Sequence, residues 1–344
     1  MLVGGSCSVD WVTATEVAPK APDHDELVAT MTGGMSRDVA TGFAGSERLR
    51  PDGRPKPELR TELRRIPNGR NAISVVAALI APAALVALVV WLSVPLLWIA
   101  AVPVMGILQN RMYILHHEAA HRLLFSNRML NDRIGINLIG WLPFGTGTHS
   151  YRRGHANHHR DEFGPKEPDF LLYSFYPIAA SSARRKLRRD ALGVSAYRIA
   201  KPRFTGLFNR KFAKYSLRYL AGQVLVFSLF LLAGQPLMYL LLWVLPYATY
   251  YQVINRLRSI AEHGGMTRSS DRRHTTHHVR QSPLARALFV PFGVGFHLAH
   301  HVDSGVPFRN LAKLHQILVE DGYFPAGAEW PSYRAFWKAA ITPA

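Results

Sequence analysis

Four long apolar runs alternate with strongly polar segments along this 344-residue chain. The runs cover residues 72–92, 96–115, 219–233 and 237–254. A helix of about 20 apolar residues crosses a hydrocarbon core about 30 Å thick; the third run reaches that length only if its helix begins near Tyr215. Links of three residues join the runs in pairs. The pattern therefore predicts an all-α integral membrane protein with four transmembrane helices arranged as two hairpins.

Basic residues gather beside the apolar runs rather than spreading evenly. Lys and Arg number 41 against 23 Asp and Glu, which gives a formal net charge of +18. Cytoplasmic ends of membrane helices carry such an excess of bases, so we expect a multi-pass protein whose termini and histidine-rich polar cap face the cytoplasm. A nucleic-acid-binding protein would also be basic, but that interpretation leaves the apolar runs unexplained. Cys7 is the only cysteine, which excludes an intrachain disulfide and a thiolate metal site.

The polar segments differ in composition. Residues 1–45 show no sustained periodicity and are predicted to be a disordered leader. Residues 46–71 hold eight Arg and Lys interrupted by prolines and are predicted to form a basic juxtamembrane arm. Residues 323–344 are predicted to form a C-terminal amphipathic tail. The basic run 184–189, inside the polar insert 160–214, is expected to contact anionic lipid head groups or to dock an acidic electron carrier.

Three histidine clusters lie beside the apolar runs. They read His116-His117-Glu118-Ala119-Ala120-His121, His155-Ala156-Asn157-His158-His159 and His297-Leu298-Ala299-His300-His301. Residues i, i+3 and i+4 share one face of a helix, so each cluster is expected to aim two or three imidazoles at one point. Neutral imidazole is a nitrogen ligand suited to iron, zinc, copper and nickel. Together the clusters indicate a metal centre at a membrane surface.

A fourth stretch, His274-Thr275-Thr276-His277-His278, has the same spacing of histidines. It lies in a segment rich in Arg, Ser and Asp, with no apolar face that would fix it beside a metal. We therefore expect this stretch to take no part in the metal centre.

Residues 117–121 also satisfy HExxH, the helix motif of zinc peptidases, in which the glutamate acts as general base. A catalytic zinc takes three protein ligands and would leave two clusters without a role. Two, three and three histidines, with His263 after the fourth apolar run, make nine, a number that fits two metal ions. Two ions held by neutral imidazoles next to lipid favour redox chemistry with iron and dioxygen over hydrolysis.

With these motifs the chain resembles the membrane fatty acid desaturase family over about residues 72–322. The resemblance rests on HEAAH at 117–121, HANHH at 155–159, AEHGG at 261–265, FHLAHH at 296–301 and LAKLH at 311–315. It implies a non-haem di-iron centre that uses O2 and two electrons to remove two hydrogens from an acyl chain. The ligands that it implies are His117, His121, His155, His158, His159, His263, His297, His300 and His301.

Four further residues are expected to lie next to the ligands. Metal-bound histidine usually donates its other N–H to a carboxylate or a carbonyl, so Glu118 and Glu262 are candidate acceptors. His116 directly precedes a ligand, and Asn157 could orient a ligand or a water molecule.

The resemblance leaves the reaction and the partners partly open. Di-iron sites of this type also serve lipid and carotenoid hydroxylases and ketolases, and no residue here separates them from desaturases. Residues 167–169 and 302–305 depart from the family's usual sequences, so the substrate stays open among acyl lipids, acyl-CoA and acyl-carrier thioesters. We expect a separate electron donor such as a ferredoxin, contact with membrane lipids and no nucleic-acid partner. A haem-carrying membrane protein, a non-enzyme alternative, would be expected to place its ligand histidines within facing spans.

Overall fold

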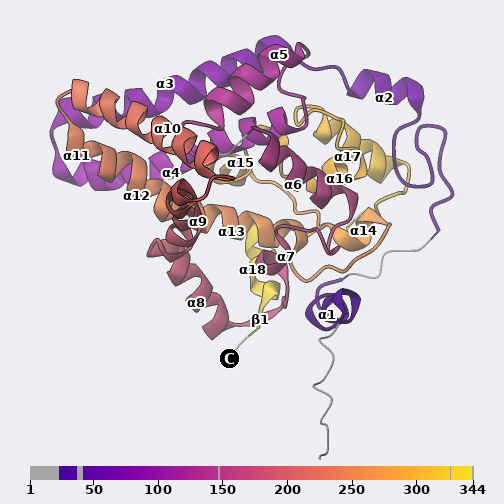
Figure 1. Cartoon of the computed structure of the whole chain (residues 1–344). Coiled ribbons are helices and arrows are strands. Elements are labelled where there is room, and N and C mark those ends of the chain that lie inside the picture. Colours follow the sequence, from indigo (N-terminus) through magenta and orange to yellow (C-terminus); the bar gives the residue numbers. More distant parts are fainter. Residues whose placement is uncertain (1–22, 37–41, 146–147, 326, 343–344) are drawn as a thin grey trace, which may run out of the picture.

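The computed structural model describes residues 23–36, 42–145, 148–325 and 327–342, except for the side chains of residues 148 and 149. Helices dominate this part of the chain (Figure 1). In order they begin with α1 (His24–Met31), α2 (Pro57–Leu63), α3 (Asn68–Leu92), α4 (Pro95–Ala120), α5 (Arg128–Leu130), the π-helix η1 (Asn131–Ile139), α6 (Thr148–Arg160), α7 (Phe170–Tyr173) and α8 (Ala180–Ala191). They continue with α9 (Val194–Thr205), η2 (Gly206–Phe208), α10 (Ala213–Leu232), α11 (Pro236–Tyr239), the π-helix η3 (Leu240–Val244), α12 (Leu245–Ala248) and α13 (Tyr250–His263). The last are α14 (Arg272–Thr275), α15 (Pro283–Leu288), η4 (Pro291–Gly293), α16 (His297–Val302), α17 (Leu311–Glu320) and α18 (Tyr333–Ala340).

The long apolar helices and the histidine-bearing helices occupy different sides of the molecule. Figure 1 shows α3, α10, α11 and α12 on one side, and α6, α14, α16 and α17 on the other. α4 belongs to both sides, because it packs against α3, α12 and α13 and also against η1 and α6. Its C-terminal end therefore carries the first histidine cluster from the apolar helices into the polar cap.

Strand structure is confined to one very short pair among the described residues. β1 (Ile178–Ala179) and β2 (Ile341–Thr342) run parallel, with Ile178 opposite Ile341 and Ala179 opposite Thr342. The prediction of a helical protein is thus confirmed, with this pair as the exception. The pair ties the end of α18 to the start of α8.

Three stretches of the described chain are long and apolar enough to cross a membrane. They are Pro57–Leu92, which contains α2 and α3, then Ala213–Leu232, and Pro236–His263, which contains α11 to α13. The fourth expected span corresponds to α4, whose inner half is made less apolar by Gln109, Asn110 and Arg111. Gln109 Nε2 donates to the carbonyl of Trp243 at 2.9 Å, so the donor side of this buried amide is paired inside the protein. Three candidate spans are therefore found, and the fourth span and the two-hairpin arrangement stay predictions.

The backbone of α4 approaches α13 closely at a glycine. A Cβ atom added at Gly106 would lie 2.9 Å from Cβ of Tyr250. Because Gly106 has no side chain, the two helices can approach within this distance. The approach brings the C-terminal end of α4 and the histidine at the end of α13 into one region.

Part of the predicted disordered leader is an ordered helix. α1 begins with a capping box formed by Asp23 and Glu26, and it buries Val28 against Phe163 and Met266. The prediction of disorder was therefore wrong for residues 24–31, because a single apolar side chain finds partners far along the chain. Residues 1–22 and 37–41 lie outside the described residues, and Cys7 with them.

The basic arm packs on the C-terminal part of the protein. Arg48 pairs with Asp321, and Arg60 Nε lies 2.6 Å from Oδ2 of Asp303. Leu63 is buried at 1 % exposure. Arginines of this arm thus form ion pairs with aspartates that directly follow α16 and α17. Asp303 is one of the residues that depart from the family's usual sequence, and its carboxylate accepts hydrogen bonds from Arg60.

Candidate metal centre

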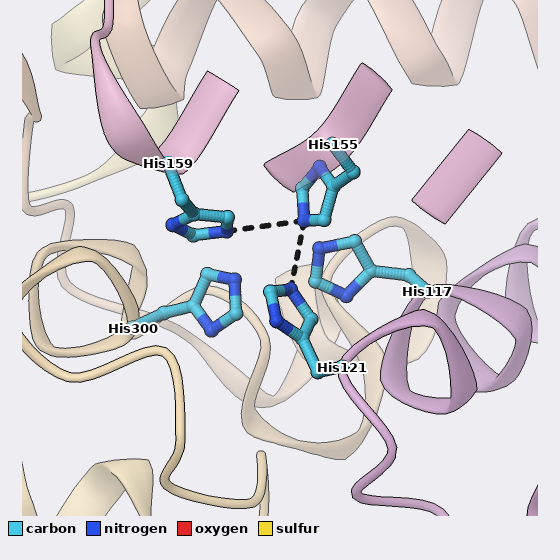
Figure 2. Close-up of side chains that lie close together, drawn as sticks. All are labelled: His117, His121, His155, His159 and His300. Atoms are coloured by element: carbon cyan, nitrogen blue, oxygen red, sulfur yellow. Dashed lines mark hydrogen bonds between the residues drawn. The ribbon is translucent and has the colours of Figure 1, made fainter. Parts of the chain in front are cut away.

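Nine imidazoles converge in two adjacent groups contributed by α4, α6, α13 and α16. Group one, drawn in Figure 2, contains His117, His121, His155, His159 and His300. Group two contains His158, His263, His297 and His301. Within each group the candidate ligand atoms lie within 4.8 Å of one another. The structure thus brings together all nine histidines that the sequence indicated as candidate ligands.

Each HxxHH cluster is divided between the two groups. In the α6 cluster, His155 and His159 belong to group one, and His158 belongs to group two. α16 shows the reverse arrangement, with only His300 in group one. Consecutive residues point about 100° apart around a helix, whereas residues i and i+4 differ by only about 40°. Each cluster thus aims two imidazoles at one group, within the expected two or three, and the adjacent histidine of each HxxHH cluster faces the other group.

Nitrogen atoms approach one another closely inside each group. The Nε2–Nε2 distances are 2.8 Å for His155–His121, 3.1 Å for His155–His159, 3.0 Å for His297–His263 and 3.1 Å for His297–His301. The central nitrogen of each trio can share a hydrogen with only one of its two neighbours, so hydrogen bonds alone do not satisfy either trio. Two imidazole nitrogens each about 2.1 Å from one metal ion, at right angles, lie about 3 Å apart. The observed distances match that arrangement.

Further imidazole nitrogens of the two groups are buried without a hydrogen-bond partner among the described residues. They are Nδ1 of His117, His159 and His297 and Nε2 of His300. Leaving one buried polar atom unpaired costs about 1–3 kcal/mol. Nδ1 of His117 and Nε2 of His300 are the unpaired atoms that an ion in group one could satisfy, whereas His159 and His297 already direct Nε2 into the close contacts of their groups. A set of nitrogen donors without thiolates suits a divalent ion such as iron or zinc. Both groups therefore fit a metal ion.

Three imidazoles of group two have Nδ1 fixed by an acceptor. His158 Nδ1 lies 2.7 Å from Oε2 of Glu167, His263 Nδ1 lies 2.9 Å from the carbonyl of Thr275, and His301 Nδ1 contacts Oε1 of Glu162. When Nδ1 carries the hydrogen, the lone pair of the imidazole is on Nε2. These contacts leave Nε2 as the atom available to an ion in group two, as in most metal sites with histidine ligands.

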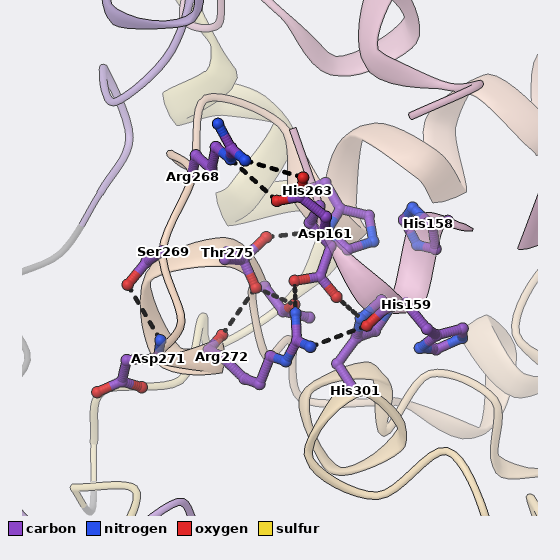
Figure 3. Close-up of polar contacts among 12 residues, drawn as sticks. His158, His159, Asp161, His263, Arg268, Ser269, Asp271, Arg272, Thr275 and His301 are labelled. Carbon is purple, nitrogen blue, oxygen red and sulfur yellow. Dashed lines mark hydrogen bonds and ion pairs between the residues drawn. The ribbon is translucent and has the colours of Figure 1, made fainter. Parts of the chain in front are cut away.

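Glu162 is the most connected of these acceptors. It is 1 % exposed, contacts His301, and pairs with the guanidinium of Arg272. Arg272 also donates to the carbonyl of His159 at 2.8 Å, and Figure 3 shows these two residues close to His301. The carboxylate thus links α6 to α14 and α16. The sequence analysis missed Glu162, although its position three and four residues after two ligand candidates was a usable signal, since such residues share a helix face.

Arg152 fixes the end of α4 from the neighbouring helix. Its Nε donates to the carbonyl of Ala120 at 2.9 Å, and NH2 donates to the carbonyl of Ala119 at 3.1 Å. Asp132 pairs with the same guanidinium. A cation at a helix C-terminus satisfies carbonyls that lack intrahelical partners. Because His121 follows Ala120 directly, this contact positions a member of group one.

Burial keeps most of these imidazoles neutral. It lowers the pKa of His121 to about 3, with repulsion from His158 and Arg152 as smaller causes. Burial, followed by repulsion from neighbouring imidazoles, also lowers the pKa of His155 and His300 well below the usual value. Burial acts in the same direction on His158 and is the largest single influence, but the hydrogen bond to Glu167 and the attraction of nearby carboxylates together outweigh it and raise the pKa of His158. Neutral imidazole is the form that binds a metal ion.

These shifts predict that the metal-free protein loses stability in mild acid. In the unfolded chain an imidazole has a pKa of about 6.5, so it is protonated below that pH. In the folded protein the pKa values of His121 and His155 are lower, so these imidazoles stay neutral and the unfolded chain binds more protons. Each such group lowers the free energy of unfolding by up to about 1.4 kcal/mol per pH unit. We expect the thermal midpoint of metal-free, detergent-solubilised protein to fall between about pH 7.5 and about pH 5.5. An unchanged or higher midpoint at the lower pH would contradict this assignment.

Glu262 lies where the sequence placed it, and Glu118 has another partner. Glu262 Oε1 lies 3.5 Å from Nδ1 of His297 and accepts a hydrogen bond from Arg258 at 2.7 Å. Glu118 Oε1 instead accepts from the backbone N–H of Phe308 at 3.0 Å. This bond ties α4 to the segment before α17. It does not support the prediction that Glu118 accepts from a ligand imidazole.

His116 and Asn157 lie beside the centre without joining it. His116 Nδ1 is 3.2 Å from the carbonyl of Gly135 in η1, and its ring lies against Tyr151 with centroids 4.8 Å apart. Tyr151 in turn stacks on His155, so His116 touches group one through one intervening ring. Asn157 is half-buried on α6 and belongs to neither group.

The fourth HxxHH stretch is buried, so the reason given for setting it aside was wrong. His277 and His278 are 4 % and 3 % exposed. The backbone N–H of His277 donates to the carbonyl of Glu262 at 2.8 Å, which pairs this segment with the end of α13. None of its three histidines belongs to group one or group two, as expected.

Comparison with known proteins agrees with this site. The family model described as fatty acid desaturase matches residues 93–333, which include every histidine of both groups. The chain belongs to the fatty acid desaturase family. Among curated proteins, a dihydrorhizobitoxine desaturase of Bradyrhizobium elkanii is 30% identical over 251 residues, which cover 67% of this chain and 70% of that relative. The resemblance that the sequence predicted is thus confirmed.

Two cavities lie on neighbouring faces of α4 in this member of the fatty acid desaturase family. A polar cavity of about 60 Å³ is lined by histidines of both groups, together with Tyr113, Tyr151 and Arg258. An apolar cavity of about 310 Å³ lies among α3, α4 and α10 and includes Met112 in its wall. Tyr113 and Met112 are consecutive residues of α4, so the two cavities border the same turn of this helix on faces about 100° apart.

Proposed function

We propose that this chain is an oxygen-dependent desaturase that removes two hydrogens from adjacent carbons of a fatty acyl chain. Two iron ions would be held by the five histidines of group one and the four of group two, with O2 as co-substrate. The observation that carries the proposal is the pair of adjacent all-imidazole groups in a member of the fatty acid desaturase family.

Bound iron would supply the dioxygen and one-electron chemistry that amino-acid side chains lack. The residues around it supply orientation and exclude water. Glu162, Glu167 and the Thr275 carbonyl hold three imidazoles with Nε2 free. Arg152 fixes the end of α4 next to His121. The polar cavity, which borders both groups, offers the space in which the reacting carbons would lie, and burial keeps bulk water from the site.

The apolar cavity supports an acyl substrate. Its volume of about 310 Å³ is at the lower end of the range for ligand sites, and almost all its walls are apolar side chains. It lies among helices that are candidate membrane spans, so an acyl chain would enter from the lipid side. We propose an acyl lipid or an acyl thioester as the substrate.

We further propose that the histidine-rich cap and both termini face the cytoplasm, where a separate donor such as a ferredoxin supplies electrons. The surface of α8 and α9 supports a membrane-facing cap. Its basic residues are interleaved with exposed aromatic side chains of α9, Tyr197 at 64 % and Phe204 at 47 % exposure, and Phe208 of the adjoining η2 is 93 % exposed. Aromatic and basic side chains together are typical of a membrane interface.

Metal analysis and lipid profiling test the proposed function together. The chain would be purified in detergent from cells supplied with both iron and zinc, and its metals counted by mass spectrometry. We expect about two irons per chain and a new double bond in the lipids of the expressing cells. Cells expressing the His158→Ala variant are the control for lipids made by the host.

The other outcomes separate the alternatives. About one zinc per chain with little iron would support an HExxH peptidase. Two irons with products that retain a hydroxyl or keto oxygen would support a related hydroxylase or ketolase. A Soret absorption band in the purified protein would support a haem carrier.

A further inference from the structure

A third group of metal-ligating side chains lies outside the two histidine groups. It consists of His278, His315 and Glu329, whose candidate ligand atoms lie within 4.8 Å of one another. The three residues come from the loop after α14, from α17 and from the segment before α18. We propose that they form a separate zinc site, which ties these three segments together.

The two imidazoles of this site are held against each other. Their ring centroids are 3.7 Å apart and their planes are inclined by 22°. Phe296 and Phe324 lie beside them, with centroids 5.8 Å and 5.9 Å from that of His278. Aromatic walls around two nitrogen ligands limit access of water, which strengthens electrostatic attraction between the ligands and a cation.

Backbone hydrogen bonds place Glu329 beside His278. The N–H of Trp330 donates to the carbonyl of His278 at 2.9 Å, and the N–H of Arg280 donates to the carbonyl of Trp330 at 2.9 Å. This pairing brings Glu329 Oε2 within 3.5 Å of His278 Nε2. The other oxygen, Oε1, accepts from Nε of Arg280 at 2.9 Å. The carboxylate is thus oriented from one side and keeps one oxygen for an ion.

Pairing within the chain leaves these imidazoles unsatisfied. Nδ1 of His278 and Nδ1 of His315 are buried and have no hydrogen-bond partner among the described residues. An imidazole nitrogen without a partner in the chain is a candidate metal ligand.

Two histidines and a glutamate, with water as a fourth ligand, are a set that binds zinc in tetrahedral geometry. Glu329 keeps 21% of its side chain exposed, which leaves a path for that water. Arg280 is the nearby competing cation, and its side chain is 67% exposed, so its repulsion of an ion is screened by solvent.

The site is connected to group two through the same loop. Thr275, three residues before His278, provides the carbonyl that fixes Nδ1 of His263. The N–H of His277 donates to the carbonyl of Glu262, the residue before His263. An ion bound by His278 would hold this loop in place and thereby hold His263 in its orientation. The proposed role is structural, at a distance from the reacting atoms.

Metal counting on variants tests the site. The full-length protein would be purified in detergent from cells supplied with iron and zinc. We expect about one zinc per chain in addition to iron, and a fall in zinc to below about a tenth of that value in His315→Ala and in Glu329→Gln. Iron content is expected to stay near the wild-type value in both variants, which also reports that they fold. His274→Ala, in the same loop but outside every group, is the matched control and should keep its zinc.

A second variant distinguishes zinc bound at the proposed site from zinc bound in group one or group two. His158→Ala is expected to lose iron and keep its zinc, so failure of the iron centre and failure of this site give different results. Absence of zinc from the wild-type protein, or its loss in His158→Ala, would overturn the proposal. If the His315 and Glu329 variants do not fold, X-ray absorption at the zinc edge of the wild-type protein decides. Two imidazoles with oxygen ligands support the site, and four or five imidazoles refute it.

Discussion

Replacing His300 by alanine is expected to abolish activity and to remove iron from group one. His300 is 2 % exposed and is the only residue of α16 that joins this group. The change deletes one of five candidate ligands there and leaves His297 and His301 in group two intact. His158→Ala is the converse variant, because it deletes the only α6 ligand of group two. We expect iron content to fall from about two to about one or less in either variant, and turnover to fall by more than about 100-fold.

The paired variants should be measured side by side for iron per chain and for unsaturated product. His274→Ala changes a histidine outside every candidate metal group and should retain both. Retained activity in His300→Ala or His158→Ala would show that the corresponding group is not the reacting centre. Equal loss in His274→Ala would show that the assay reports general instability.

Glu162→Gln is expected to weaken metal binding without destroying the fold. The substitution keeps the shape of the side chain but removes the charge that faces Arg272 and His301. Loss of a residue that hydrogen-bonds a metal ligand typically costs about 10–100-fold in metal affinity or activity. Glu162→Ala should cost more, because it also removes the side-chain oxygen that accepts from the half-buried guanidinium of Arg272.

The measurement is the concentration of a competing chelator that removes half the iron, compared between wild type and variant. Asp161→Asn is the matched control, since the neighbouring carboxylate is 42% exposed and pairs with Arg268 on the outside of the site. We expect a shift of about 10-fold or more toward lower chelator concentration for Glu162→Gln and little shift for Asp161→Asn. Equal shifts would show that Glu162 does not act through His301.

The sequence could predict the chemistry of the centre better than its geometry. Histidine spacing on short helices is a local property, so eight of the nine members could be named from their clusters, and the resemblance to the desaturase family implied all nine, including His263. The partners of those histidines are not local. Glu162 and His301 are 139 positions apart, and only the packing of α16 against the end of α6 brings them together. The 100° rotation between His158 and His159 was available from the sequence, but which group each would face was not.

Other differences have equally physical causes. The apolar run of α4 is interrupted by Gln109 and Asn110, whose amide N–H groups donate to backbone carbonyls of distant segments, and no sequence pattern reveals such partners. The fourth HxxHH stretch looked like a solvated loop because its neighbours are Arg, Ser and Asp. Arg273 is in fact 6 % exposed and paired with Asp271, so charged residues here belong to the interior.

The division of α6 and α16 between the two groups has a consequence for how the centre fills. Each of these helices contributes ligands to both groups, so a helix that is held by an ion in one group is already oriented for the other. The ordering cost of the second ion is then smaller than that of the first, and loading becomes cooperative. Chains with a single ion are expected to be scarce at half saturation, and the population should divide mainly between empty and filled centres.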